Sequence, residues 1–241
     1  MFIILILILI VVLIVSYMKN NAISVKLKTF KEKGAKADAG QFGVYCYNGA
    51  QGKGKTYSLT EFVYDKPDLI VYSNFHFLPT IFNHYHNDII YYDTGFNNLM
   101  KIKNDLDSGI LNIPVGKQLI IIYDELFQDL MRGDKLSREV LDFLSQMRKR
   151  KIIFLTSAQY WSEIPITFRR FVRYQIDCNF LNLSLLPFSI LVKVFRDGDL
   201  IKWSNDEQDF VAPIIETSIT KVRKNVFDSY NTFELVKKVE K

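Results

Sequence analysis

The sequence predicts an α/β protein with a mainly parallel β-sheet that is covered by helices. From residue 42 to residue 156, short apolar runs typical of buried strands alternate with segments in which apolar residues recur at helical spacing. Parallel strands need crossover connections, and the crossover helices cover the faces of the sheet. Hydrophobic residues make up 49% of the 241-residue chain, which is enough for an ordered core and excludes general disorder.

The expected elements follow one another in a regular order. Buried strands are expected at residues 42–47, 69–73, 89–92, 118–123 and 152–156. Helices are expected at residues 55–64, 97–108 and 138–150. Beyond Tyr174 the pattern changes, and residues 175–182 and 190–203 predict a small β-rich C-terminal extension that turns at Asp197-Gly198-Asp199.

The chain begins with an apolar segment. Residues 2–15 are apolar without interruption, and Ser16, Tyr17 and Met18 follow before the first lysine. A membrane span takes about 17–25 residues, so this segment is at the short end of that range. It lacks the basic segment that precedes a signal peptide and the small-residue cleavage pattern that follows one. We therefore expect an uncleaved transmembrane helix at residues 1–18.

The segment after this helix is basic. Residues 19–40 contain one run of lysines: Lys19, Lys26, Lys28, Lys31, Lys33 and Lys36. Because positive flanks stay inside, the N-terminus is expected outside and the rest of the chain in the cytoplasm. The same lysines also suit a solvated linker or anionic headgroups. The formal charge of +5 permits contact with nucleic acid or lipid without requiring it.

A glycine-rich phosphate-binding motif joins the first strand to the first helix. It matches G-x-x-x-x-G-K-[ST] in full: Gly49, Ala50, Gln51, Gly52, Lys53, Gly54, Lys55 and Thr56. Main-chain N–H groups of such a loop attract phosphate oxygens, and so does the first turn of the following helix, which includes Tyr57. Lys55 is expected on the β- and γ-phosphates and the Thr56 hydroxyl on Mg²⁺. The motif predicts a P-loop NTPase fold with ATP and Mg²⁺ as cofactors.

Two acids follow the Ile-rich strand at residues 118–123. Asp124 is expected to hold Mg²⁺, because P-loop proteins place a carboxylate at the tip of a neighbouring strand. Glu125, one residue further, is expected to act as the general base that polarises the attacking water. Two acids downstream of a complete phosphate loop are a far more specific signal than one acid after a strand.

Further candidates lie at residues 156–173. The strand at residues 152–156 runs into Thr156-Ser157-Ala158-Gln159, and Gln159 is our choice for a side chain that senses the γ-phosphate, with Thr156 or Ser157 as alternatives. Arg169 and Arg170, with Arg173 nearby, are candidates for an arginine finger that reaches a neighbouring subunit's ATP. A solvated basic face explains these arginines and the basic residues 148–151 equally well.

These motifs together resemble the Zot-like (zonula occludens toxin-like) assembly ATPases of filamentous phages, within the FtsK/HerA class of P-loop motors. The resemblance covers residues 41–177 and includes the spacing of about 70 residues between the phosphate loop and the acids. It implies a membrane ATPase that drives extrusion of single-stranded phage DNA while coat proteins assemble around it, and a homo-oligomeric ring. Zot-like proteins carry their membrane span after the ATPase, whereas here the apolar segment comes first.

The expected organisation therefore has four parts. These are a membrane anchor at residues 1–18, a basic linker at 19–40, a P-loop ATPase domain at 41–178 and a β-rich extension at 179–241. The expected location is the host's inner or cytoplasmic membrane, with the ATPase in the cytoplasm. A nucleotide-regulated scaffold that recruits coat proteins without substantial ATP turnover is the alternative function. A small-molecule kinase is disfavoured by the membrane anchor.

The remaining reactive side chains predict no second site. Cys46 and Cys178 belong to no CxxC or Cys/His pattern, so we expect both to be buried and reduced. His84 and His86 would supply two metal ligands without a third, which is weak support for a metal site.

Overall fold

The computed structural model describes most of the chain from Phe42 onward. The described residues are 23–25, 42–64, 66–78, 88–126, 129–130, 133–182, 188–204 and 209–231. The predicted membrane anchor at residues 1–18 lies outside them, as do His84, His86 and nearly all of the predicted linker. Among the described residues, no helix is both long and apolar enough to span a bilayer.

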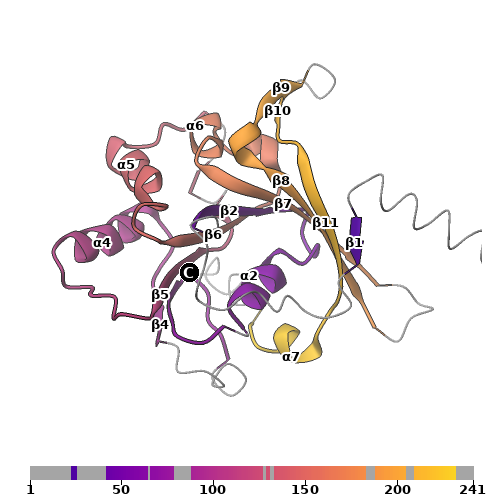
Figure 1. Cartoon of the computed structure of the whole chain (residues 1–241), viewed down its shortest axis with the longest axis horizontal. Coiled ribbons are helices and arrows are strands. Elements are labelled where there is room, and N and C mark those ends of the chain that lie inside the picture. The colour runs from indigo at the N-terminus through magenta and orange to yellow at the C-terminus, as the bar shows by residue number, and fades with distance from the viewer. Residues whose placement is uncertain are drawn as a thin grey trace, which may run out of the picture.

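The described strands form a nine-stranded sheet in the order β1-β11-β8-β7-β2-β6-β5-β3-β4, and a separate two-stranded sheet of β9 and β10 (Figure 1). The bounds of the large sheet's strands are β1 Ile23–Val25, β2 Gly43–Asn48, β3 Leu69–Ser73, β4 Asp88–Tyr91, β5 Gln118–Tyr123, β6 Ile153–Ala158, β7 Val172–Leu181, β8 Ile190–Asp197 and β11 Ile214–Lys221. The small sheet consists of β9 Lys202–Ser204 and β10 Asp209–Val211.

The large sheet has a parallel half and an antiparallel half. Strand β2 pairs in parallel with β6 and β7, and β5 pairs in parallel with β3 and β6. Beyond β7 the direction changes, because β8 pairs antiparallel with both β7 and β11, and the edge strand β1 pairs in parallel with β11. The prediction of a mainly parallel sheet is confirmed. The boundary predicted at residue 178 falls inside β7, so the β-rich segment extends the same sheet.

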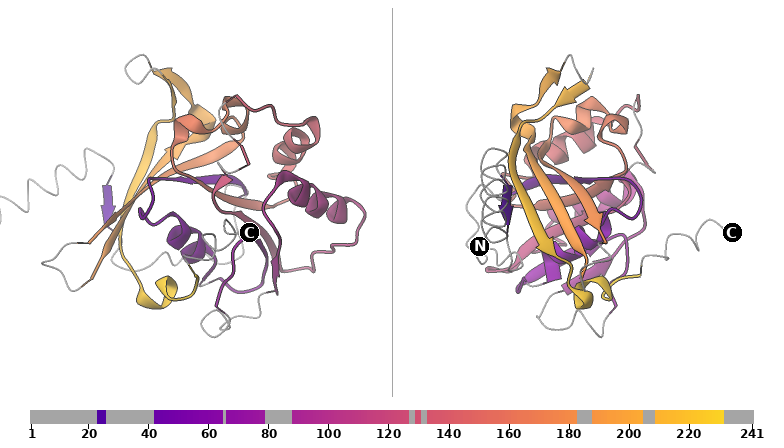
Figure 2. Two further views of the ribbon diagram at one scale, coloured as in Figure 1. Left: turned by 180° about the vertical axis from the view of Figure 1, so that it is seen from behind. Right: turned by 90° about the vertical axis from the view of Figure 1, so that its right-hand side faces the viewer.

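Helices pack on both faces of this sheet. On one face lie α4 Phe96–Asp107 and α5 Arg138–Gln146, and on the other lie α2 Lys55–Tyr64 and the short α7 Lys224–Phe227 (Figures 1 and 2). The alternation along β5 serves both layers, since Ile120 and Ile122 face α2 whereas Ile121 faces α4 and α5. This is why the strand reads as an unbroken apolar run.

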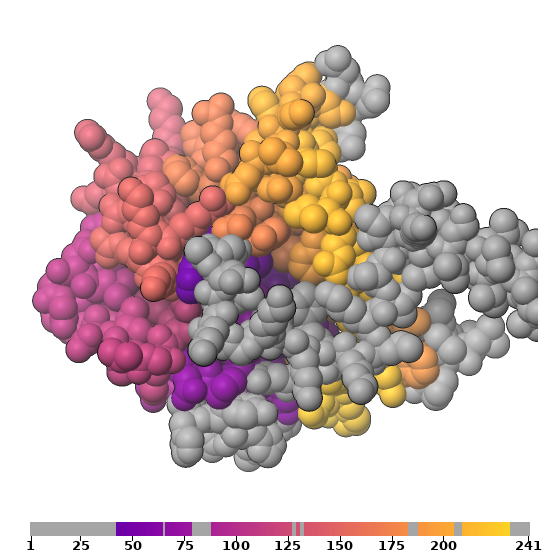
Figure 3. Space-filling view, viewed as in Figure 1, coloured from indigo at the N-terminus to yellow at the C-terminus, as the bar shows by residue number. Residues whose placement is uncertain are grey.

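The C-terminal β-structure turns where the sequence predicts it. The segment expected at residues 190–203 forms β8 and β9, and the 3-10 turn between them, Gly198–Leu200, overlaps the turn predicted at Asp197-Gly198-Asp199. The Asp197 side chain accepts a hydrogen bond from the Asp199 N–H, which ends the strand and starts that turn. In the space-filling view the residues of the C-terminal part, in orange and yellow, lie beside the residues of the preceding part, in magenta to salmon (Figure 3).

The third predicted helix is shorter than expected. Helix α5 ends at Gln146, whereas the apolar spacing predicted a helix to residue 150. Lys151 adopts a left-handed φ of 56°, and the Ile152 N–H donates to the Met147 carbonyl at 2.9 Å. The chain reverses there and enters β6.

Candidate nucleotide-binding site

The glycine loop lies at the carboxyl end of β2, where open α/β sheets place their ligands. It runs from Gly49 to Gly54 and leads directly into α2, which begins at Lys55. Gly49 has a φ of 148° and Gly54 a φ of 87°, conformations that other residues rarely adopt. A Cβ at Gly54 would lie 2.8 Å from Leu191 Cδ1, and one at Gly49 would lie 2.8 Å from the Cys178 carbonyl oxygen. Both positions therefore require glycine.

The Lys55 side chain lies over the loop, in the position expected for a lysine that binds phosphate oxygens. Its Nζ donates to the carbonyl oxygens of Gly49, at 2.7 Å, and Ala50, at 3.2 Å. Burial lowers the pKa of Lys55, and the nearby carboxylates of Asp124 and Glu125 oppose this shift. The ammonium group is thus held inside the curl of the loop, where phosphate oxygens would replace the carbonyls as its partners.

The other residues predicted to bind the nucleotide differ in exposure and contacts. Gln51 and Gly52 are exposed at the tip of the loop. Lys53 donates from Nζ to Asn179 Oδ1 at 2.9 Å, which ties the loop to the end of β7. The Tyr57 side chain points into the core and only 1% of its surface is exposed, so only its main chain can face a phosphate.

Thr56 and Asp124 are brought together as the two motifs predict. The Thr56 hydroxyl donates to Asp124 Oδ2 at 2.7 Å. The other carboxylate oxygen, Oδ1, accepts from the Glu125 N–H at 3.1 Å and from the Ser157 hydroxyl. Glu125 is half-buried beside this cluster, with a left-handed φ of 59°. The first turn of α2 and the tip of β5 therefore present hydroxyl and carboxylate oxygens to the same point.

These oxygens suit Mg²⁺. Mg²⁺ prefers oxygen ligands and is usually held by one or two carboxylates together with phosphate oxygens and water. Within the described residues, no group of three or more His, Cys, Asp or Glu side chains is placed to hold a metal ion, and a nucleotide-bound Mg²⁺ needs none. Thr56 and Asp124 would hold the ion, which would neutralise phosphate charge when bound.

The tip of β6 lies between the glycine loop and the acids, because β6 pairs with both β2 and β5. Among the three candidates there, the Thr156 hydroxyl donates to the Tyr123 carbonyl at 2.8 Å. The Ser157 hydroxyl contacts Asp124 and accepts from the Glu125 N–H at 2.9 Å. Gln159 follows the end of the strand and is half-buried. Its role as a sensor stays a prediction.

The predicted arginine finger needs a revision. Arg169 is 2% exposed, and its guanidinium donates to Asp209 Oδ1 at 2.8 Å and to the carbonyls of Ser162 and Ile164, each at 2.7 Å. This arginine fastens β10 to α6 (Ile166–Arg169) and is not available to a neighbouring subunit. Arg170 is exposed and remains the candidate. Both precede β7, so they lie at the edge of the sheet opposite the glycine loop.

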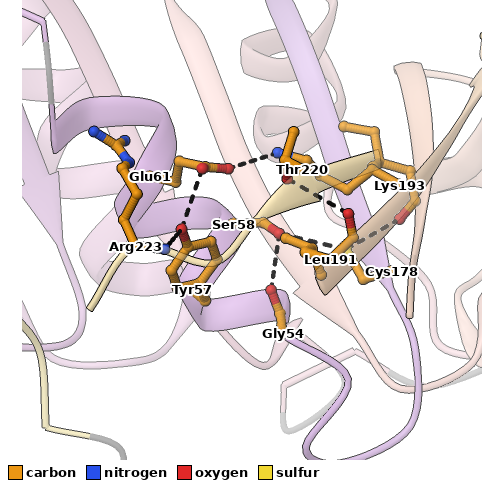
Figure 4. Close-up of polar contacts among 10 residues, drawn as sticks. Gly54, Tyr57, Ser58, Glu61, Cys178, Leu191, Lys193, Thr220 and Arg223 are labelled. Atoms are coloured by element: carbon orange, nitrogen blue, oxygen red, sulfur yellow. Dashed lines mark hydrogen bonds and ion pairs between the residues drawn. The ribbon is translucent and has the colours of Figure 1, made fainter. Parts of the chain in front are cut away.

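A buried polar network fixes α2 beneath the loop (Figure 4). Lys193 on β8 donates to Glu61 Oε2 at 2.7 Å, and the two side chains are 6% and 3% exposed. Glu61 Oε1 also accepts from the Tyr57 hydroxyl at 3.2 Å, and that hydroxyl accepts from the Arg223 N–H at 3.0 Å. The helix that carries Lys55 and Thr56 is therefore tied to the antiparallel half of the sheet.

Sequence reasoning missed one residue of the site. Asn74 follows β3 directly, and its side-chain amide makes hydrogen bonds with the main chain of Asp124 on both sides: Nδ2 donates to the carbonyl at 2.9 Å, and Oδ1 accepts from the N–H at 2.8 Å. The available signal was a polar residue at the carboxyl end of a parallel strand, the edge where the other site residues gather.

Comparisons with known proteins give only distant likenesses. No protein-family model and no curated protein matches the chain. The zonular occludens toxin N-terminal domain from Neisseria meningitidis is 17% identical with a TM-score of 0.48, over 78% of this chain and 98% of that domain. Genome packaging NTPase B204 from Sulfolobus turreted icosahedral virus 2, in complex with ATP-gammaS, is 11% identical with a TM-score of 0.46, over 74% of this chain and all of that one.

The ATPase domain of G40P is 10% identical, with a TM-score of 0.49, over 92% of this chain and 96% of that domain. A Zot domain thus stands among the similar structures. At these values the function of this chain has to be inferred from its own site.

Proposed function

We propose that this chain is a membrane-anchored P-loop ATPase that drives filamentous phage assembly and the extrusion or translocation of single-stranded DNA. The observation that carries the ATPase part is the contact between Thr56, in the first turn of the helix after the glycine loop, and Asp124 at the tip of β5. A merely flexible glycine loop would not need a hydroxyl and a carboxylate facing each other beside a buried lysine.

The residue roles follow from this arrangement. Main-chain N–H groups of the loop and Lys55 bind the β- and γ-phosphates, and Thr56 and Asp124 hold Mg²⁺. Glu125 accepts the proton of the attacking water, since it directly follows Asp124 and has a carboxylate of its own. Gln159 reports the state of the γ-phosphate, and Arg170 reaches the ATP of the next subunit in a ring.

The membrane and DNA parts of the proposal are supported by sequence. The apolar run at residues 2–15 and the lysines after it support a single-pass anchor with the ATPase in the cytoplasm. The resemblance to Zot-like ATPases supports phage assembly, a homo-oligomer, coat proteins and single-stranded DNA as partners. Among the similar structures described above, B204 is a genome packaging NTPase and the Zot domain is the N-terminal domain of a zonular occludens toxin.

ATPase assays of the detergent-solubilised chain, with and without single-stranded DNA, test this function. We expect turnover that DNA stimulates and that Glu125→Gln abolishes while nucleotide binding is kept. If phage release survives Glu125→Gln, the chain acts as a nucleotide-regulated scaffold for coat proteins instead. Measurable turnover without any response to DNA would contradict the translocation part.

A further inference from the structure

Asn74 makes a two-point contact with the acid that ends β5. It is only 8% exposed and lies just beyond the β3–β5 ladder, whose last paired residues are Ser73 and Ile122. The Asn74 main-chain N–H still donates to the Ile122 carbonyl at 3.3 Å. Its side-chain amide then serves both main-chain groups of Asp124. The side chain thus replaces the next step of the ladder and holds Asp124 against the sheet.

Glu125, the residue after Asp124, has an unusual backbone conformation. It has a φ of 59°, a left-handed conformation that an L-residue keeps only when its surroundings impose it. The Glu125 N–H is directed between Asp124 Oδ1 and the Ser157 hydroxyl, at 3.1 and 2.9 Å. Contacts from β3 and β6 therefore fix the same short turn from its two sides.

This arrangement assigns separate tasks to the two oxygens of Asp124. Oδ1 is occupied by Ser157 and the Glu125 N–H, so Oδ2 is the oxygen that faces Thr56. Asp124 is only 2% exposed. If the Asn74 amide is removed, water has little access to the Asp124 main-chain N–H and carbonyl, so both groups lose a hydrogen bond that water does not replace. The turn could then relax, which would rotate Oδ2 away from Thr56 and move the Glu125 carboxylate.

We infer that Asn74 is a positioning residue that, with Ser157, holds Asp124 and Glu125 in the geometry needed to bind Mg²⁺ and activate water. This inference rests on the proposed nucleotide site. Residues that orient metal ligands typically change metal affinity or activity 10–100-fold when they are removed. The effect of Asn74 should therefore appear in the Mg²⁺-dependent part of nucleotide binding and not in the Mg²⁺-independent part.

Nucleotide binding to full-length Asn74→Ala, measured by calorimetry with Mg²⁺ and with EDTA, tests this inference. We expect affinity in EDTA to stay within about twofold of wild type, and the gain in affinity from Mg²⁺ to fall at least about tenfold. Asn98→Ala is the matched control, because Asn98 also donates from its amide to main-chain carbonyls, of Asp93 and Thr94, but at the start of α4. It should keep the full response to Mg²⁺.

Ser157→Ala completes a double-mutant cycle. Because both residues hold one turn, the loss in Asn74→Ala/Ser157→Ala should be smaller than the sum of the single losses. If Asn74→Ala fails to fold, Asn74→Ser, which is neutral and replaces the amide by a shorter hydroxyl, takes its place with the same expectation.

A second readout needs no ligand. Hydrogen exchange of the Glu125 amide in the nucleotide-free protein should be at least about tenfold faster in Asn74→Ala than in Asn98→Ala. Wild type that binds no nucleotide would refute the proposed function, and the exchange measurement would still test the turn. Wild-type binding with an unchanged response to Mg²⁺ and unchanged exchange in Asn74→Ala would overturn the inference about Asn74.

Discussion

The two halves of the large sheet use polar groups in opposite ways. In the parallel half, polar side chains gather at the carboxyl ends of β2, β3, β5 and β6, where Lys55 lies on the glycine loop and Thr56 contacts Asp124. In the antiparallel half, Lys193 forms a buried ion pair with Glu61. We propose that the first set of charges binds a ligand, whereas the second joins α2 to the sheet. A change in the first should alter binding, and a change in the second should alter stability.

The largest expected effect is on stability. Lys193→Met removes one partner of the buried Lys193–Glu61 pair and leaves the Glu61 carboxylate without its counter-charge, which should lower the free energy of unfolding by about 3–5 kcal/mol. Urea denaturation measures this. The double variant Glu61→Leu/Lys193→Met should recover most of the loss, because it leaves no isolated buried charge. Equal stability of wild type and Lys193→Met would show that the pair does not hold α2.

Lys55→Ala should change binding and leave the fold intact. Charged hydrogen bonds contribute about 1.5–3 kcal/mol each, so ATP affinity should fall roughly a hundredfold, which calorimetry can measure. Lys53→Ala is the control within the same loop, since Lys53 pairs with Asn179. A loss of stability comparable to that of Lys193→Met would mean that Lys55 serves the fold rather than the ligand.

Alkaline pH should weaken the protein through Cys178. Burial raises the pKa of this thiol from 9.0 to about 11. The folded state keeps a proton that the unfolded state releases, so this contribution to stability is present below pH 9 and is lost as the pH rises toward 11. The slope for one such group is about 1 kcal/mol per pH unit. Denaturation at a series of pH values should show a shallower decline for Cys178→Ala, and identical slopes would contradict the assignment.

The smallest expected effect belongs to an exposed ion pair. Arg148 donates to both carboxylate oxygens of Asp199, but both side chains are nearly half exposed. Arg148→Ala should lower the free energy of unfolding by less than about 1 kcal/mol, because solvent screens such pairs. Thermal denaturation of Arg148→Ala and Lys193→Met under the same conditions compares the contributions of the exposed and the buried ion pair directly. A loss of 3 kcal/mol or more would show that exposure does not separate the two pairs.

The parallel half was predictable because its signals are local. The glycine spacing of residues 49–56, the Ile-rich strand before Asp124 and the helical spacing of residues 55–64 each depend on a short stretch of sequence, and each expected element is present. The contact between Thr56 and Asp124 also followed, since parallel strands and their helices place such groups at one edge.

What sequence could not predict depends on contacts between distant segments. The Asn74 amide meets Asp124 across β3 and β5. The position of Asn74 after a predicted strand places it at the correct edge of the sheet, but it does not indicate which residue Asn74 contacts there. The buried state of Arg169 depends on Asp209, which lies in β10, a strand that the sequence analysis did not predict. The Glu61–Lys193 pair likewise joins a helix and a strand far apart in the chain.

ATP binding to wild type and Asp124→Asn, titrated with Mg²⁺ and with EDTA, tests the nucleotide site most directly. Wild type should bind ATP more tightly with Mg²⁺, and Asp124→Asn should lose that gain while it keeps wild-type affinity in EDTA. Absence of ATP binding to wild type, or an undiminished Mg²⁺ response in Asp124→Asn, would contradict the site described here.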